Sequence, residues 1–329
     1  MRSVITFITI LTALCIASGC SKVEEKRPIK ISINVWPGYA HAFIAQKKGF
    51  FKNNNVDVEL VLKEDISEAK ELFERGEVDG LFNVFTDIIM INSQGIWTKV
   101  VYIADYSDTG DVIIGGPQFN SLADLKGKRV SFEGINSFSH MFVLRALDEV
   151  GIREYDVQFE NIHAMDVLSA LEERRIDAGH TWEPITTQAL ERGYKILAKA
   201  GDIPGIIIDV LAFREKVIRE RPDEIQAIVK SVLEARDFIY SNRKEALEIM
   251  SESEGIPMKE LEEGVRGVHF PDLEETTQAM KKSEQAASLH NSGEIILDFF
   301  VKRGQLSERL DLGKIIEPRF LINVQGENK

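Results

Sequence analysis

Carboxylate side chains recur where predicted strands of this chain give way to turns. Asp87, Asp105, Asp111, Glu183 and Asp209 supply five of them. A buried carboxylate is costly unless a partner neutralises it, and few basic residues fall at the same turns. A cation carried by a ligand is one partner that would satisfy them. The alternative is structural, since Asp87 could cap the helix after it and Asp111 or Asp209 could hold backbone amides.

Three large aromatic residues, Trp36, Tyr39 and Trp182, occupy comparable positions. Trp36 and Tyr39 lie in a turn between a predicted strand at 31–35 and a predicted helix at 42–48. In open α/β sheets, ligands bind beyond the carboxyl ends of the strands, where this turn lies. Aromatic faces attract cations and stack on flat heterocycles, so an amine or a nitrogen heterocycle is favoured as ligand. The alternative is that the rings are ordinary turn and core residues.

Polar side chains complete the predicted ligand contacts. Asn83 and Thr86 precede one predicted helix, and Ser137 and His140 open another. The free amides and hydroxyls of a helix start suit an anion, although Ser137 is equally well explained as a helix cap. A zwitterion such as an aminosulfonate could use both the acids and this helix start. No arginine stands at a predicted site turn, which disfavours a ligand such as nitrate alone, although Arg145 inside the helix could reach.

The sequence lacks the patterns of an enzyme or a metal protein. Its six histidines show no metal-ligand spacing, and no phosphate-binding loop or nucleophile motif occurs. The two cysteines stand at positions 15 and 20, so a domain beginning after them has no thiol. We therefore predict no catalytic residues, no cofactor and no metal site, and a protein that is not an enzyme.

The N-terminus carries the pattern of an export signal. One positive charge precedes an apolar run at 4–17 that is short for a membrane-spanning helix. The small residues before Cys20 resemble a bacterial lipobox, although a larger aliphatic residue is more usual where Ala17 stands. By that resemblance, residues 1–19 are a lipoprotein signal peptide, Cys20 becomes the lipid-modified first residue, and residues 20–28 form a tether. The alternative is a cleaved signal followed by an incidental cysteine.

Composition narrows the class of partner. The formal net charge is −13, and it becomes −14 without residues 1–19 because Arg2 is their only charged residue. An acidic exported protein is a poor binder of nucleic acid. The charge mostly serves solubility, and it also favours a cleft that holds a cation. About 300 residues remain after the tether, enough for one large domain or two lobes.

Strands and helices alternate through the first two thirds of the chain, which predicts parallel sheets covered by helices. The first unit has predicted strands at 31–35, 56–62, 77–82 and 97–104 and helices at 42–48, 65–74 and 88–94. The second has strands at 112–115, 128–132, 157–162, 176–180 and 194–198 and helices at 121–127, 134–150, 166–174 and 185–192. The similar segments 74–80 and 173–179 indicate two related α/β lobes.

The last third reads differently. Residues 201–213 form a predicted apolar strand, long enough to return to the first lobe. Helices are predicted at 223–240, 243–254, 258–264, 273–290 and 294–303. Asp223 and Glu224 behind Pro222 are typical of a helix start. The tail after Glu317 is expected to be loose.

In this order, the parts resemble the solute-binding proteins of ABC importers, in the branch that binds nitrate, aliphatic sulfonates, taurine and thiamine pyrimidine precursors. The resemblance spans about residues 29–275. It rests on Trp36-Pro-Gly-Tyr39 with Gly49-Phe-Phe51, Val78-Asp-Gly80 with Thr86-Asp87, Asp105-Tyr-Ser107 with Gly110-Asp111, Asp124-Leu-Lys-Gly-Lys-Arg-Val130, Thr181-Trp-Glu-Pro184, and Ile203-Pro-Gly205 with Asp209-Val-Leu211.

The resemblance implies an α/β, two-lobed periplasmic-binding-protein-like fold of type II, with a ligand cleft between the lobes and a helical C-terminal part. Residues 29–111 would form the first part of lobe 1, 112–206 lobe 2, and 207–329 the return to lobe 1 with the C-terminal helices. The hinge would lie near 111–115 and 205–213.

The implied function is that of a monomeric receptor, lipid-anchored at the outer face of a bacterial membrane, that passes a small cationic or zwitterionic solute to an ABC permease and ATPase. Alternatives are a sensor for a membrane kinase or chemoreceptor, a binder of sulfonate or nitrate anions, and an enzyme on the same fold. The export signal and the absence of a nucleophile–base pair argue against the enzyme.

Overall fold

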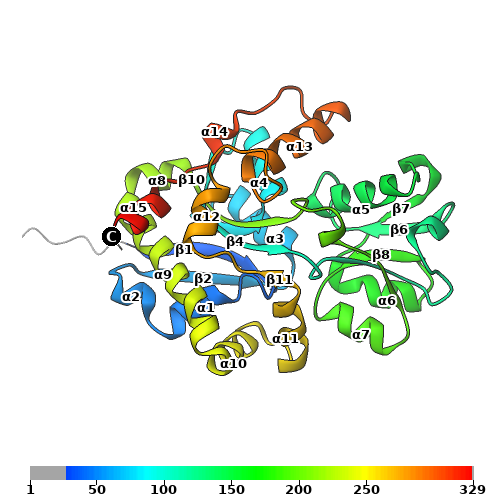
Figure 1. Ribbon diagram of the computed structural model, residues 1–329, viewed down its shortest axis with the longest axis horizontal. Helices are drawn as coiled ribbons and strands as arrows, with labels where there is room; N and C mark the ends of the chain where they lie inside the picture. Colours follow the sequence, from blue (N-terminus) through cyan, green and yellow to red (C-terminus); the bar gives the residue numbers. More distant parts are fainter. Residues whose placement is uncertain (1–26, 328–329) are drawn as a thin grey trace, which may run out of the picture.

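The computed structural model describes residues 27–327, which form two lobes, each built around one β-sheet (Figure 1). The predicted signal peptide, Cys20 and most of the tether lie outside the described residues. Within the described part, no helix combines the length and the apolar character needed to cross a membrane.

The first lobe holds a six-stranded sheet in the order β11-β4-β10-β3-β1-β2. β1 pairs in parallel with β2 and β3, whereas β10 runs antiparallel between β3 and β4. The predicted return of the chain to this lobe is therefore confirmed, and it makes the sheet mixed where a parallel sheet was predicted. The bounds are β1 Ile29–Asn34, β2 Val58–Lys63, β3 Gly80–Val84, β4 Thr98–Ser107, β10 Ile208–Arg214 and β11 Val268–His269.

The returning strand is shorter than predicted. It begins at Ile208, because residues 200–202 turn as a short 3₁₀ segment, η4 (Ala200–Asp202), and Gly205 adopts a left-handed φ of 81°. A side chain at Gly205 would also come within 2.5 Å of the Ala286 carbonyl oxygen. These turns use up the first seven residues of the predicted strand.

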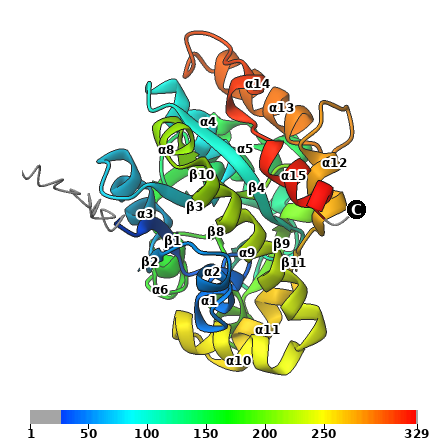
Figure 2. The ribbon, with the colours of Figure 1, turned by 90° about the vertical axis from the view of Figure 1, so that its left-hand side faces the viewer.

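The helices of the first lobe cover both faces of this sheet and extend well beyond it. Figure 2 shows α10 and α11 at one end of the lobe and α13 and α14 at the other. The bounds are α1 His41–Lys47, α2 Phe50–Asn53, α3 Ile66–Glu74, α4 Phe85–Ser93, α8 Glu215–Glu220, α9 Pro222–Ser241, α10 Arg243–Glu254, α11 Met258–Arg266, α12 Leu273–Ala279, α13 Leu289–Lys302, α14 Leu312–Ile315 and α15 Arg319–Glu327.

Two predictions for the C-terminal part are wrong. The single helix expected at 273–290 is broken after Ala279, where the Ser288 hydroxyl donates to the Lys281 carbonyl and the Tyr106 hydroxyl donates to the Ala287 carbonyl. Side chains thus take the place of helical amides. The tail expected to be loose forms α15, because Phe320, Leu321 and Val324 make an apolar stripe that is buried.

The second lobe holds a five-stranded sheet in the order β7-β6-β8-β5-β9. β6 is parallel to β7 and β8, and β5 runs antiparallel between β8 and β9. Its strands are β5 Val112–Gly115, β6 Arg129–Phe132, β7 Gln158–Asn161, β8 Ala178–Thr181 and β9 Lys195–Lys199. Its helices are α5 Phe138–Glu149, α6 Val167–Glu172 and α7 Ile185–Glu191, with 3₁₀ segments η1 Leu122–Leu125, η2 Glu154–Asp156 and η3 Ala164–Asp166.

Two segments join the sheets, residues 108–111 and 200–207. They run side by side, because the Gly201 amide donates to the Asp108 carbonyl over 2.6 Å. The predicted hinge ranges overlap these connections only at their edges, since most of each range lies inside β5 or β10. The lobe boundaries drawn from the sequence stay a prediction.

Candidate ligand-binding site between the lobes

A small cavity lies between the two lobes, close to the segments that join them. Both lobes contribute to its wall, which is formed by Asn34, Trp36, Tyr39, Ile66, Val84, Asp111, Phe138, Trp182 and Asp209. The cavity measures about 10 Å³, which is roughly the space that one water molecule needs. An organic solute can therefore enter only when the lobes separate or the lining side chains move.

Three aspartates meet beside this cavity. Asp105 near the end of β4 stands opposite Asp209 near the start of β10, and Asp111 immediately precedes β5. Their exposed fractions are 0, 2 and 2 % for Asp105, Asp209 and Asp111. The cluster forms because β4, β10 and β5 all begin or end where the chain crosses between lobes.

Burial and mutual repulsion set the protonation of this cluster. Burial raises the pKa of Asp209 well above its usual range, and the nearby carboxylates of Asp105 and Asp111 raise it further. Burial likewise raises the pKa of Asp105, and the hydrogen bond from the Trp36 indole lowers that pKa in part. Asp105 Oδ1 and Asp209 Oδ2 are buried without a hydrogen-bond partner among the described residues. The site therefore favours a proton or a cation.

The aromatic turn after β1 supplies donors to two of these acids. Trp36 Nε1 donates to Asp105 Oδ2 over 3.2 Å, and the Tyr39 hydroxyl donates to Asp209. Gly38 is required between the rings, because a Cβ there would lie 2.0 Å from Asp105 Oδ2 and 2.4 Å from Trp36 Nε1. The Pro37-Gly38 turn thus lets the chain approach the acids closely.

Asp111 belongs to a chain of hydrogen bonds that the sequence did not reveal. The Nε2 atom of His180 lies 2.9 Å from Asp111 Oδ1, and Nδ1 of the same ring lies 2.7 Å from Ser139 Oγ. Ser139 Oγ also accepts a hydrogen bond from the Glu133 amide. The network assigns the ring proton to Nε2, with the Ser139 hydroxyl donating to Nδ1. Asp111 is therefore held at the cavity wall by a buried histidine.

The aromatic rings pack edge to face across the cleft. Trp36 from one lobe and Trp182 from the other have ring centroids 6.3 Å apart at 89°. Phe138 lies 6.2 Å from Trp182. Trp182 Nε1 and Asn34 Oδ1 are buried and have no hydrogen-bond partner in the part of the chain that the structure describes. With Asp209 Oδ2, one donor and two acceptors of the cavity wall thus lack partners among the described residues.

Asp87 joins the lobes to each other. Its Oδ1 accepts the Phe138 amide of the second lobe over 3.0 Å, and Lys70 donates to its Oδ2 over 3.2 Å. The alternative that Asp87 caps a helix of residues 88–94 is wrong, because α4 begins at Phe85 and Asp87 lies within its first turn. Lys70, which the sequence reasoning missed, already balances this carboxylate.

The predicted anion site at the start of α5 is occupied by the protein itself. Ser137 is the N-cap, as its alternative explanation held, because its hydroxyl oxygen accepts the His140 amide over 3.2 Å. His140 stacks on Phe132 with centroids 4.1 Å apart, and its Nδ1 accepts the Asn136 amide. Burial lowers the pKa of His140 to about 4, so the ring is neutral at pH 7. Neither side chain belongs to the cavity wall.

Of the remaining side chains predicted to contact ligand, some already make hydrogen bonds within the protein and others make none. The Glu183 carboxylate accepts the Thr187 amide over 3.1 Å and the Thr187 hydroxyl over 2.9 Å, so it stabilises the start of α7. Asn83 Nδ2 and Thr86 Oγ1 are buried without a hydrogen-bond partner among the described residues. Neither of these two residues belongs to the cavity wall.

A second contact between the lobes joins Asp65, Glu133 and His163. The His163 ring bonds to Asp65 of the first lobe and lies 3.7 Å from Glu133, which also accepts the Ser67 hydroxyl over 3.0 Å. Burial, with Asp65 close by, raises the pKa of Glu133 to about 7. The sequence predicted no metal site. These three side chains lie close enough to share an ion, and they are bonded to one another here.

This architecture is the periplasmic-binding-protein fold. The alkanesulfonate-binding protein SsuA of Xanthomonas axonopodis pv. citri, solved with MOPS, superposes with a TM-score of 0.73 at 15 % identity, covering 89 % of this chain and 99 % of its own. The nitrate-binding protein NrtA of Synechocystis PCC 6803 gives a TM-score of 0.75 at 13 % identity, covering 92 % of this chain and 89 % of its own. At such identities the likeness bears on the fold alone, and it confirms the predicted two-lobed α/β arrangement.

The chain belongs to the NMT1/THI5-like family, whose model matches residues 36–246. A protein of Brucella abortus (strain 2308), named only as a candidate binding protein, is 24 % identical over 322 residues, covering 93 % of this chain and 95 % of its own. The taurine-binding periplasmic protein of Escherichia coli (strain K12) is 25 % identical over 153 residues, covering 46 % and 47 %. The predicted family resemblance is thereby confirmed.

A relative named as an enzyme is also found. The 4-amino-5-hydroxymethyl-2-methylpyrimidine phosphate synthase of Candida albicans (strain WO-1) is 25 % identical over 226 residues, covering 64 % of this chain and 66 % of its own. The relatives of this chain therefore include both proteins named for binding and a protein named for catalysis.

Proposed function

We propose that this protein is the extracytoplasmic solute-binding component of an ABC importer, and that it captures a small cationic or zwitterionic nitrogen compound between its lobes. The observation that carries the proposal is the cluster of Asp105, Asp111 and Asp209, buried beside a cavity whose wall contains no lysine or arginine. The fold and the names of several relatives are those of binding proteins.

The charge of the cluster supports a cation. The raised pKa values of Asp105 and Asp209 favour a proton on this pair, and a ligand ammonium or protonated ring nitrogen could replace it. Such a charge-assisted hydrogen bond is roughly twice as strong as a neutral one. Trp36, Tyr39 and Trp182 offer ring faces and edges to the same ligand, which suits a flat pyrimidine or a compact amine.

The unpaired polar atoms extend this reading to zwitterions. Trp182 Nε1 is a donor of the cavity wall without a partner in the described part of the chain, so it could hold an acceptor at the far end of the ligand. An aminosulfonate, with an ammonium at one end and sulfonate oxygens at the other, would satisfy acids and donors together. The name of the taurine-binding relative is consistent with this class.

A purely anionic ligand receives less support from the site. The names of several relatives refer to sulfonate or nitrate. Here the amides at the start of α5 that would bind an anion are already bonded: the Phe138 amide donates to Asp87 and the His140 amide donates to Ser137. Three further carboxylates would also repel an anion. A sensor role remains an alternative, since it would use the same cleft.

We further propose that the protein is not an enzyme. Ser139, His180 and Asp111 form a serine–histidine–carboxylate chain, but its order is reversed relative to the cavity. The carboxylate faces the cavity, whereas Ser139 is fully buried and its oxygen already accepts the Glu133 amide. A nucleophile must reach its substrate, so this chain positions Asp111.

The cellular setting of the proposal rests on the N-terminal sequence. A lipid on Cys20 would tether a monomeric receptor to the outer face of the membrane, within reach of the permease. The names of the periplasmic relatives agree with export. Labelling of expressing cells with a radioactive fatty acid, compared between wild type and Cys20→Ala, tests the anchor: label on wild type alone is expected, and equal label or none on both would contradict it.

Binding is tested by thermal melting of the purified protein against amines, pyrimidines, aminosulfonates, sulfonates and nitrate. Saturation at 100 times the dissociation constant adds about 2.7 kcal/mol. We expect a shift with cationic or zwitterionic compounds, and its loss in Asp209→Asn and Trp182→Ala. Asp57→Asn, an exposed change of the same chemistry, serves as control. Shifts that survive both cleft variants would contradict the proposed site.

A further inference from the structure

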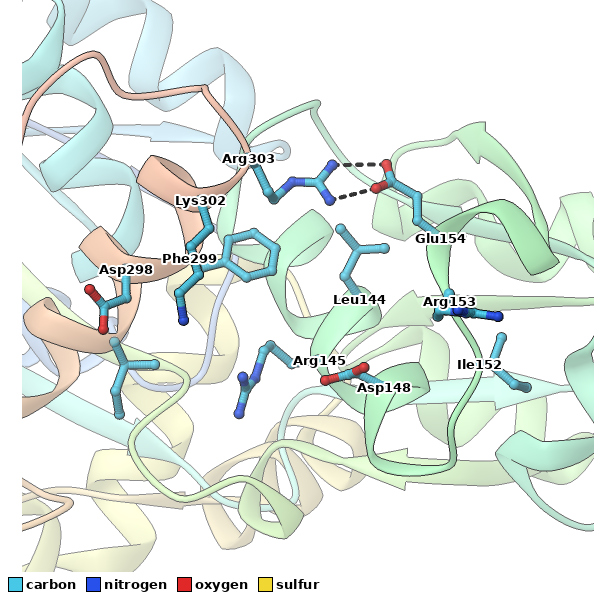
Figure 3. Close-up of a pocket in the computed structure, with 11 residues that line it drawn as sticks. Leu144, Arg145, Asp148, Ile152, Arg153, Glu154, Asp298, Phe299, Lys302 and Arg303 are labelled. Atoms are coloured by element: carbon cyan, nitrogen blue, oxygen red, sulfur yellow. Dashed lines mark hydrogen bonds and ion pairs between the residues drawn. The ribbon is translucent and has the colours of Figure 1, made fainter.

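A second pocket lies on the outside of the molecule, between α5 of the second lobe and α13 of the first (Figure 3). Its volume is about 430 Å³, within the usual range for small-molecule sites. Arg145, which sequence reasoning considered for the cleft, lines this pocket instead. The pocket shares no residue with the wall of the interlobe cavity.

Most of the charged groups around the pocket are already paired. Arg303 holds Glu154 through two hydrogen bonds of 2.5 and 2.8 Å, which bridge α13 to the second lobe above the pocket. Asp298 bonds to Arg309. Asp148 is the one acidic lining residue for which the described residues contain no ion pair. The pocket therefore retains one unpaired carboxylate, that of Asp148.

Two cations in the wall have weak partners or none. Arg145 reaches Glu149 only at 3.9 Å, and its Nε atom is buried without a hydrogen-bond partner. Lys302 makes no hydrogen bond or ion pair within the described part of the chain. Figure 3 shows both side chains extending from their helices into the space between α5 and α13. On a protein of net charge −13, two uncommitted cations in one concavity are a local exception.

The remaining lining residues are four apolar side chains and Arg153, whose guanidinium lies 3.8 Å from Asp156 and over the Tyr155 ring. Phe299 presents its ring to the pocket, and Leu144, Ile152 and Ile295 line it, with Ile295 exposed at 38 %. A ligand for this wall needs an anionic head that accepts hydrogen bonds and a body that covers apolar surface. Inorganic phosphate or chloride would leave the apolar part uncovered.

We propose that this pocket binds a small amphiphilic organic anion, with one carboxylate or sulfonate held by Arg145 and Lys302 and an aromatic or short aliphatic body packed on Phe299. Because α5 and α13 belong to different lobes, the bound anion ties the lobes together on their outer side. The site is complete only while the lobes are in the arrangement described here. Its occupancy therefore favours closure of the cleft from a distance.

The probe is 2-naphthalenesulfonate, titrated calorimetrically into the purified protein, with neutral 2-naphthol as the uncharged counterpart. We expect saturable binding of the sulfonate and at least tenfold weaker binding of the alcohol. Arg145→Gln and Lys302→Gln should each weaken the sulfonate at least fivefold. Lys216→Gln, an exposed change on α8, should leave it unaltered, as should Trp182→Ala in the cleft.

Each other outcome counts against the proposal. The proposal would be overturned if the sulfonate showed no saturable binding to wild type. It would also be overturned if both pocket variants bound the sulfonate as tightly as wild type does. Loss of the sulfonate in Trp182→Ala with retention in the pocket variants would place the anion in the cleft, which overturns this proposal and also counts against a cationic cleft ligand. If the sulfonate does not bind to the pocket but amines still bind in the cleft, this proposal is overturned and the proposed function stands.

Discussion

Replacing Asp209 by Asn should make the protein more stable and its cleft less able to bind. Asn keeps an oxygen that accepts the Tyr39 hydroxyl and places an uncharged amide opposite Asp105, so the shape of the cluster is preserved. Only one ionisable group is lost. The substitution therefore separates the effect of the buried acids on stability from their effect on ligand binding.

The magnitude follows from the register of the strands. Asp105 and Asp209 face each other on β4 and β10, and side chains so placed lie about 5 Å apart. Two charges at that distance repel by about 3 kcal/mol at an effective dielectric constant near 20. For a domain of about 300 residues, 3 kcal/mol corresponds to a shift of roughly 5 °C in the melting midpoint.

The sign depends on pH. Because the pKa of Asp209 is raised above its ordinary 3.8, the stability linked to its proton is present at low pH and is lost as pH rises toward the folded-state pKa. We expect Asp209→Asn to melt close to wild type at pH 4 and several degrees above it at pH 8. A cationic ligand that displaces the shared proton should release about one proton on binding to wild type. Calorimetry in buffers of different ionisation enthalpy measures that release.

Two results would refute this reasoning. If Asp209→Asn melts below wild type at pH 8, the acids are not a liability in the unliganded cleft. If the variant binds the same amine as tightly as wild type, Asp209 does not meet the ligand. Asp57→Asn, exposed and remote from the cluster, controls for the general effect of removing one negative charge.

Three further substitutions test neighbouring parts of the account. Gly38→Ala places a Cβ 2.0 Å from Asp105 Oδ2 and should cost about 1–3 kcal/mol in unfolding free energy, measured by urea titration, whereas Gly326→Ala has no atom within 4 Å and should not destabilise; equal effects would contradict the close approach. Burial raises the pKa of Glu254 to about 8, so wild type should lose about 5 kcal/mol relative to Glu254→Gln between pH 4 and pH 9, and parallel stability curves would contradict this. Lys70→Gln leaves Asp87 without its cation and should lower the melting midpoint by a few degrees at pH 7. An unchanged midpoint would show that Asp87 needs no partner.

The order of strands and helices along the first two thirds of the chain was predictable because it follows from hydrophobic periodicity, which depends on neighbours in the chain. β1, with Ile29, Ile31 and Ile33 fully buried, illustrates this. The antiparallel strands that make both sheets mixed were not predicted. The C-terminal errors have a different origin. The break after Ala279 depends on Tyr106, a residue more than 170 positions away, and the helix α15 forms because its apolar stripe finds a surface to cover.

The candidate site was predictable in kind and less so in detail. The turn positions of Trp36, Asp105 and Asp209 identified residues that do meet, since strand ends of one sheet converge. The partners of these residues were not accessible from the sequence, because they come from the other lobe or from distant helices. Lys70 beside Asp87 and His180 behind Asp111 are examples, and each changes what its carboxylate can do.

The most direct test of the central claim compares ligands that differ in one ammonium group. Taurine and ethanesulfonate form one such pair, and benzylamine and benzyl alcohol form another. In calorimetric titration of the wild-type protein, the account predicts that the ammonium compound of at least one pair binds measurably and at least tenfold more tightly than its counterpart, with proton release. Tighter binding of ethanesulfonate than of taurine, or of benzyl alcohol than of benzylamine, would contradict a cleft built around three buried aspartates.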